Sequence, residues 1–469
     1  MAGIGFELKK LYGKNRGITR NVGAIGYSTI TTIGPTLIVV GALVITNYLM
    51  RRWGISEEEK LIFSGSLLYS FIFPLIITAI FDTVISRYVS DCIFSDQKSK
   101  ILPAVQGSTV MMTGILGVLG GGLAAALYFI SGLELLYVIM VYLTMLGVGI
   151  TFSLSVFATA MKSYRKITMS YFIGAVLIVA AASLCCKVFL LSARISMMSG
   201  FAVGFISIAV QLYYYLHVSF PRGDGSYFAY LTYIKKHALL LCSGLFYILG
   251  LYVHNFVYWA DSELQLVAVK ILYSAPNYDM ASFVAMLTSI SAMVIFVVRV
   301  ETSFYTEYKG YCEAVMGNSL NKVQFYKEKM LRVLINEVYY ISEIQIIITI
   351  ILMVLSITFL PLIGIGGITL DIYPVLALGY YAVFIVHILT IFLYYFDDQA
   401  GAAGINLAFF LMTWGFTYIT RLLGIEFYGL GLVLSGVISW IMAYARLKHM
   451  MKIIDYKMFC ENVHLTSAE

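Results

Sequence analysis

The chain has 469 residues, of which 60% are hydrophobic and 12% are charged, and its formal net charge is +6. Soluble domains carry about 25% charged residues, so a water-soluble fold of this composition would expose too much apolar surface to stay dispersed. The apolar runs are continuous, whereas the strands of a membrane barrel alternate apolar and polar residues. The composition therefore predicts an all-α polytopic membrane protein.

Twelve apolar stretches are long enough for a helix that crosses a bilayer, which takes about 20 residues. They form two groups of six, which predicts two six-helix lobes related by a pseudo-twofold axis along the membrane normal. The expected transmembrane helices are 23–50, 60–84, 104–130, 135–160, 168–192, 195–218, 237–260, 280–299, 338–360, 372–396, 402–421 and 426–448.

The segments outside these helices complete the expected domain organisation. Apolar and basic residues of the N-terminal arm fall on different faces of a short helix, which is typical of a helix on the inner leaflet; an unstructured basic arm is the alternative. A second amphipathic helix is expected over 321–337. The expected parts are the arm 1–20, an N-terminal lobe 21–218, a cytoplasmic linker 219–236, a C-terminal lobe 237–448 with a cytoplasmic segment 301–337, and a cytoplasmic tail 449–469.

Basic residues are distributed unevenly between the two sides of this topology. With a cytoplasmic N-terminus, 24 of the 31 Lys and Arg residues lie on the cytoplasmic side. This asymmetry follows the positive-inside rule, and it predicts that both termini are cytoplasmic. The basic residues form no continuous face, so a nucleic-acid partner is not expected.

Ionisable groups at membrane depth are candidates for function, because burying them is expensive. Arg87 is followed by Asp91 at the end of the second helix, and Arg299 is followed by Glu301 at the end of the eighth. This faint internal repeat makes all four candidates for a substrate path or gate. Helix ends also attract cations to the interface, so coincidence is the alternative.

Five further candidates lie in the second half of the chain. His254 and Asn255 stand in the seventh helix, where a hydrogen-bonded packing role competes with a functional one. Asp397 and Asp398 precede the eleventh helix, so capping of its N-terminus is favoured over cation binding. Glu343, near the start of the ninth helix, is expected to form an ion pair inside the bundle.

Several function classes lack their usual signals. The sequence has no GxxxxGK[ST] motif for nucleotide binding and no GxSxG motif,. Its six Cys residues have no metal-ligand spacing,. We therefore expect no enzyme, no catalytic residues, no metal and no cofactor. The 36 Tyr residues offer ring faces and hydroxyl groups, which together suit a sugar.

Specific segments resemble the PelG family of exopolysaccharide transporters, which belongs to the multidrug/oligosaccharidyl-lipid/polysaccharide exporter superfamily. The similar segments are MAGIGFELKK at the N-terminus, Gly34–Pro35, SRYVSD (86–91), YDMASFVAML (278–287), FVVRVETSFYTEY (296–308) and LYYFDDQAG (393–401). The resemblance covers the whole length. One departure is His254–Asn255, where an Asp-Lys pair is expected, and this puts a charge-coupling role there in doubt.

The resemblance implies export of a partly acetylated polymer rich in N-acetylgalactosamine across the cytoplasmic membrane, for a biofilm matrix. It also implies three partners: the glycosyltransferase PelF and the membrane proteins PelD and PelE. The alternatives are a flippase of lipid-linked oligosaccharide, a cation-coupled drug antiporter and a non-transporting scaffold of a synthase complex. A flippase needs a cationic site for pyrophosphate, for which Arg87 and Arg299 are the paired candidates.

Overall fold

The computed structural model describes residues 18–160, 164–223, 225–260, 263–317, 319–362, 365–457 and 459. Most of the predicted amphipathic arm, residues 1–17, lies outside these ranges. The described chain clusters into two compact units. Unit 1 comprises Ile25–Ile248 and Trp259–Ala275, and unit 2 comprises Leu249–Tyr258 and the chain from Pro276 onward.

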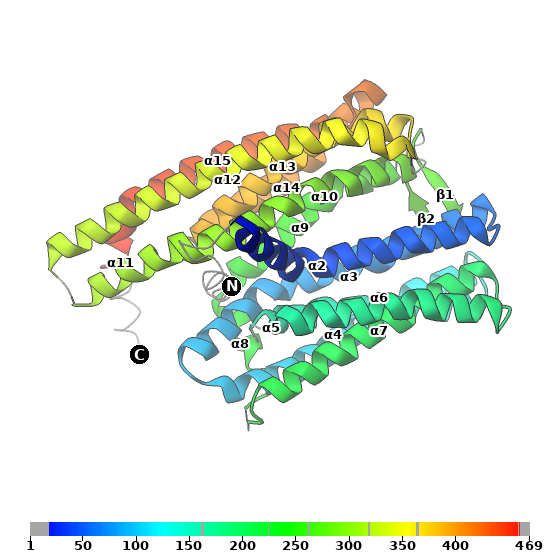
Figure 1. The fold of residues 1–469 in the computed structure, drawn as a ribbon, viewed down its shortest axis with the longest axis horizontal. Coiled ribbons are helices and arrows are strands. Elements are labelled where there is room, and N and C mark those ends of the chain that lie inside the picture. Colours follow the sequence, from blue (N-terminus) through cyan, green and yellow to red (C-terminus); the bar gives the residue numbers. More distant parts are fainter. Residues whose placement is uncertain are drawn as a thin grey trace. The chain divides into compact units, whose positions relative to one another are not determined.

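Unit 1 is a bundle of long helices. Within it, α5 packs on α3, α4 and α7, and α6 packs on α7 (Figure 1). A short helix, α8, lies in the segment predicted to be a linker. The elements are α2 (Ile18–Arg52), α3 (Glu57–Phe94), α4 (Ile101–Phe129), α5 (Leu135–Ala160), α6 (Tyr164–Lys187), α7 (Ala193–Ser219) and α8 (Tyr230–Lys236).

Glycines allow α6 and α7 to approach closely. A Cβ atom added at Gly204 would collide with Ile178, and one added at Gly200 would collide with the backbone oxygen of the same residue. Small residues at such crossings let helix backbones come together without a hydrophobic driving force from water. The pair is therefore held mainly by close van der Waals contact.

A small β-hairpin in unit 1 was not predicted. Strands β1 (Leu266–Val269) and β2 (Leu272–Ser274) pair antiparallel after the long helix α9 (Ala238–Trp259). The Tyr69 hydroxyl donates to the Tyr273 backbone oxygen at 3.0 Å, and the Tyr69 ring stacks on Trp259. This hairpin is too short to show the alternating pattern that identifies a strand.

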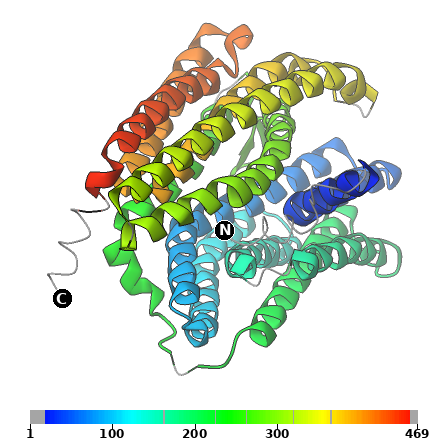
Figure 2. The ribbon, with the colours of Figure 1, turned by 60° about the vertical axis from the view of Figure 1, so that its left-hand side comes forward.

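Unit 2 is built around α13, which packs against α10, α12 and α15, while α14 packs on α15. Next to it, α11 and the first turns of α12 lie side by side as an antiparallel pair (Figure 2). The elements are α10 (Pro276–Arg299), a π-helical turn (Val300–Phe304), α11 (Tyr305–Gly317), α12 (Leu320–Leu362), α13 (Ile368–Tyr395), α14 (Gln399–Leu423) and α15 (Leu430–Tyr456).

Each of the twelve predicted transmembrane helices corresponds to a long helix, and eleven helices within the described residues are long and apolar enough to cross a membrane. The largest error concerns 321–337 and 338–360, which were predicted as separate helices. They form one continuous helix, α12. No Gly or Pro interrupts the junction, so nothing in the local sequence ends the first helix.

Candidate functional site

Arg299, at the end of α10, forms an ion pair with Glu337 on α12. Arg299 Nε donates to Glu337 Oε2 at 2.7 Å, and the guanidinium group lies 4.1 Å from the centre of the Tyr340 ring. The Glu337 side chain is 7% exposed and that of Arg299 is 40% exposed. The arginine therefore neutralises a buried carboxylate and ties α10 to α12.

This pairing corrects one expectation about the acids near Arg299 and leaves the other untested. Glu343, predicted to form an ion pair within the bundle, is exposed and forms no ion pair among the described residues. Glu337, one to two turns earlier on α12, is the buried acid instead. Glu301 lies in the π-helical turn after Arg299, and its side chain lies outside the described set.

Asp398 is the N-cap of α14, so the capping prediction is confirmed. Its carboxylate accepts the Gly401 N–H at 3.1 Å and two bonds from Arg446 on α15, at 2.6 Å from Nε and 2.9 Å from Nη2. Burial raises the pKa of Asp398, but the hydrogen bonds from Arg446 and Gly401 outweigh it and hold the pKa below its usual value,. Asp397 is exposed, and its backbone oxygen accepts from Lys457.

Further polar contacts join α11 to α12 and attach both helices to the end of α15. Asp455 on α15 accepts from Lys327 on α12 and from the Tyr311 hydroxyl on α11. Lys329 on α12 pairs with Glu307 on α11 at 3.0 Å. Together with the Arg299 and Asp398 pairs, these contacts make one charged end of unit 2 that includes α10, α11, α12, α14 and α15.

A second polar network is buried in unit 2 and is centred on His254 of α9. The Nδ1 atom lies 2.9 Å from the Tyr278 hydroxyl, and the Nε2 atom lies 3.4 Å from the Tyr380 hydroxyl. Tyr380 is also 2.7 Å from the Ser282 hydroxyl. His254 and Tyr278 are fully buried. Both ring nitrogens therefore have partners, and the network joins α9, α10 and α13.

Asn255 extends this network toward the start of α10. Its Nδ2 atom donates to Asp279 Oδ1 at 2.8 Å, while its Oδ1 atom is buried without a hydrogen-bond partner in the described part of the chain. The rings of Tyr258 and Tyr278 are in contact, and Tyr258 also contacts Tyr428. A carboxylate and several phenol rings in contact are thus gathered beside His254.

The candidates in unit 1 form a simpler arrangement. Arg87 and Asp91 are one turn apart on α3 and form an ion pair at 3.5 Å, with both side chains about two-fifths exposed. One turn before Arg87, the Oδ1 atom of Asp82 is buried and has no hydrogen-bond partner among the described residues. Buried carboxyl groups at membrane depth are functional candidates, and Asp82 was not among the predicted ones.

The sequence identified His254 and Asn255 as candidates but not the residues that they contact. Asp279, Tyr278 and Tyr380 bind His254 or Asn255 across 24 to 126 positions of sequence. Spacing within one helix carries no information about such contacts. A signal did exist for Asp82, because it is a single acid within an apolar run of α3.

The comparisons with known proteins agree with this architecture. The model of a family named PelG, described as "Putative exopolysaccharide Exporter (EPS-E)", matches residues 1–459. No curated protein matches the chain.

Solved structures of similar fold are membrane transporters. A multidrug-resistance MATE family transporter of the MOP superfamily, in an outward-facing conformation, is 12% identical with a TM-score of 0.64, and the match covers 96% of this chain and 98% of that chain. A MOP superfamily transporter from Pyrococcus furiosus is 11% identical with a TM-score of 0.65, covering 91% and 96%. The eukaryotic MATE transporter AtDTX14 is 9% identical with a TM-score of 0.62, covering 93% and 98%.

Proposed function

Because the chain belongs to the PelG family of exopolysaccharide exporters, we propose that it carries a Pel-type amino-sugar polymer across the cytoplasmic membrane for a biofilm matrix. The observation that carries this proposal is a family match over residues 1–459 on a fold shared with MOP superfamily transporters. The match makes the chain a multi-pass membrane transporter of exopolysaccharide and not an enzyme. The identity of the sugar, the membrane and the biofilm role are the proposed part.

The chemistry of the chain favours a polymer that is largely uncharged. Tyr residues can stack on the C–H faces of sugar rings and bind hydroxyl groups without the cost of burying a charge. Three partly buried cations of unit 2, Arg299, Lys327 and Arg446, are each bound to a carboxylate. A path lined in this way suits an acetylated, neutral or weakly cationic sugar better than a polyanion.

The proposed roles of the candidate residues follow their positions. Arg299 and the neighbouring Glu301, with the α11–α12 pair, gate the cytoplasmic mouth and receive the glycosyltransferase PelF. Arg87 and Asp91 serve the equivalent end of the N-terminal lobe, while Glu343, Asp397 and Asp398 lie at the cytoplasmic end of the C-terminal lobe. His254 and Asn255 hold α9 against α10 on the substrate path. PelD and PelE are the proposed membrane partners.

A lipid-linked oligosaccharide flippase is less well supported. Its pyrophosphate would need cations that are free to bind it. Arg87 is paired with Asp91, and Arg299 is paired with Glu337. Each arginine thus already has a carboxylate within its own unit.

Reconstitution tests the proposal directly. The protein and the partner glycosyltransferase are placed in sealed inverted vesicles and supplied with labelled UDP-N-acetylgalactosamine. We expect polymer that is protected inside the vesicles only when this protein is present. Polymer that accumulates outside the vesicles whether or not the protein is present would assign it a scaffold role instead.

A further inference from the structure

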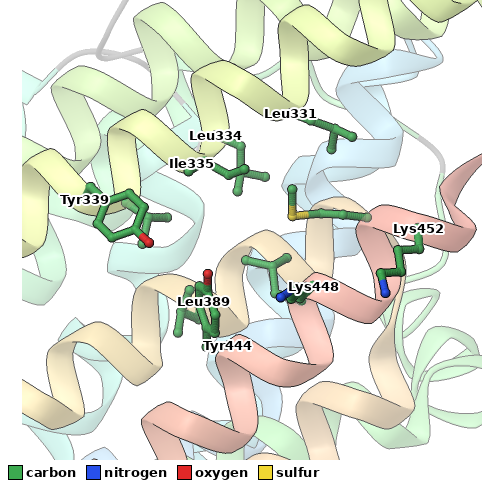
Figure 3. Close-up of a pocket in the computed structure, with 11 residues that line it drawn as sticks. Leu331, Leu334, Ile335, Tyr339, Leu389, Tyr444, Lys448 and Lys452 are labelled. Carbon is green, nitrogen blue, oxygen red and sulfur yellow. The ribbon is translucent and has the colours of Figure 1, made fainter.

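A groove in unit 2 opens between α12, α13 and α15, beside the charged end. Its volume is about 310 Å³, which is small for a ligand site,. Leu331 and Ile335 on α12 and Leu389 on α13 line the groove (Figure 3). Leu447 and Met451 on α15 line it as well. These walls are apolar, so the interior of the groove favours a hydrocarbon over water.

Two lysines on the α15 side give the groove a positive rim. Lys448 and Lys452 are one turn apart on the same face of α15, and both are exposed. Neither forms an ion pair among the described residues. The nearest acid along α15, Asp455, is bound to Lys327 and Tyr311. Two adjacent cations that form no ion pair within the described part of the chain are poised to bind one anionic group.

The groove lies along α12 close to the point where the charged part of this helix ends and its apolar part begins. The first half of α12 carries charges up to Glu343, and the following residues are uncharged to the end of the helix. Ile347, Ile351 and Val354 in this second half are exposed apolar side chains, which is typical of a surface covered by acyl chains. The groove, between Leu331 and Tyr339, lies just before this change.

We propose that this groove binds an anionic glycerophospholipid of the inner leaflet. The phosphate lies between the ammonium groups of Lys448 and Lys452, and one acyl chain follows the groove past Ile335 and Leu389 toward the apolar half of α12. Basic residues at the cytoplasmic membrane surface attract anionic lipids. The site does not depend on which polymer the protein exports.

The groove touches helices that the ion pairs also join. Leu334 and Val338 of its α12 wall flank the buried Glu337, and Leu447 follows Arg446 on α15. A lipid seated here therefore packs against α12 and α15 together. Its occupancy should stabilise the contact between these two helices.

Native mass spectrometry of the purified protein tests the site, with dioleoylphosphatidylglycerol and dioleoylphosphatidylcholine as matched probes. We expect the wild type to retain at least one phosphatidylglycerol with about tenfold higher affinity than phosphatidylcholine. The double variant Lys448→Gln/Lys452→Gln should lose about tenfold in phosphatidylglycerol affinity. Lys235→Gln/Lys236→Gln on α8, which removes the same charge from exposed positions, should retain it.

A second variant tests the apolar part of the groove. Ile335→Trp fills the groove and leaves both lysines in place, so it should also reduce lipid retention. Inorganic phosphate at millimolar concentration should not compete with the lipid. Equal affinity for the two lipids, an unchanged Lys448→Gln/Lys452→Gln variant, or an effective competition by phosphate alone would each overturn the proposal.

Discussion

Arg446 binds both carboxylate oxygens of Asp398, across 48 positions of sequence, while the same carboxylate caps the first turn of α14. The Asp398 carboxylate therefore caps the N-terminus of α14 and also joins this helix to α15. Gly401 completes the arrangement, because a Cβ atom at this position would collide with Asp398 Oδ2 and Arg446 Nε. The position of the Asp398 carboxylate thus depends on the Arg446 cation that binds it and on the absence of a side chain at Gly401.

We predict that Asp398→Asn destabilises the protein by about 1–3 kcal/mol, because the change leaves Arg446 without its carboxylate and removes a negative charge from the N-terminus of α14. Gly401→Ala should have a comparable effect through the collision. The measurement is unfolding in mixed detergent micelles. Asp397→Asn, at the exposed neighbouring position, is the matched control, and a loss as large as that of Asp398→Asn would contradict the assignment.

The contribution of Asp398 to the stability of the folded protein should depend on pH. The pKa of this carboxyl is lowered in the folded protein, so its stabilising contribution is present above the unfolded pKa of about 3.9 and is lost as pH falls through the lower folded value. The difference in Tm between the wild type and Asp398→Asn should therefore be constant from about pH 5 to 7. The difference in Tm should become smaller below about pH 4. A difference in Tm that becomes larger on acidification would contradict the lowered pKa of Asp398.

Arg299→Ala should reduce polymer export and destabilise the protein by about 1–3 kcal/mol, because it leaves the Glu337 carboxylate buried without its cation. In a double-mutant cycle, Arg299→Ala/Glu337→Gln should recover part of the stability. Lys309→Ala on α11, which disrupts only an exposed pair with Glu313, is the control. Wild-type export by Arg299→Ala at normal protein level would rule out a gating role for this pair.

Tyr278→Phe should destabilise the protein by about 1–3 kcal/mol, because it leaves the Nδ1 atom of buried His254 without its partner,. Tyr418→Phe, on an exposed position of α14, is the control. Chemical denaturation in detergent measures both. Export should fall with Tyr278→Phe if the His254 network holds the substrate path, whereas a purely structural network would lower stability and leave the export rate per folded molecule unchanged.

The predicted topology has both termini in the cytoplasm. An alkaline phosphatase, which is active only outside the cytoplasm, should be inactive when fused after Glu469 and active when inserted at Gly366, between α12 and α13. A reporter that is active only in the cytoplasm should give the opposite pattern at both positions. An active phosphatase at Glu469 would reverse the topology.

Local patterns in the sequence predicted the helices but not their partners. The apolar runs identify twelve helices because each must satisfy its own backbone in a bilayer, and Asp398 could be assigned as a cap from its neighbours alone. Glu343 was chosen over Glu337 because it is deeper along the chain, whereas burial depends on which face of α12 meets Arg299. The contacts of His254 with Tyr278 and Tyr380 depend on tertiary packing, which no spacing within α9 encodes.

The continuity of α12 has a mechanical consequence. At about 1.5 Å per residue, its 43 residues form a rod of about 64 Å,. The rod begins among the ion pairs with α11 and α15 and ends with the apolar stretch, where Pro361 stands in its last turn. A binding partner that tilts the first turns of α12 by a few degrees would therefore displace the far end by several ångströms. A force applied to α12 on one side of the bilayer would thus move the other end of the helix on the opposite side.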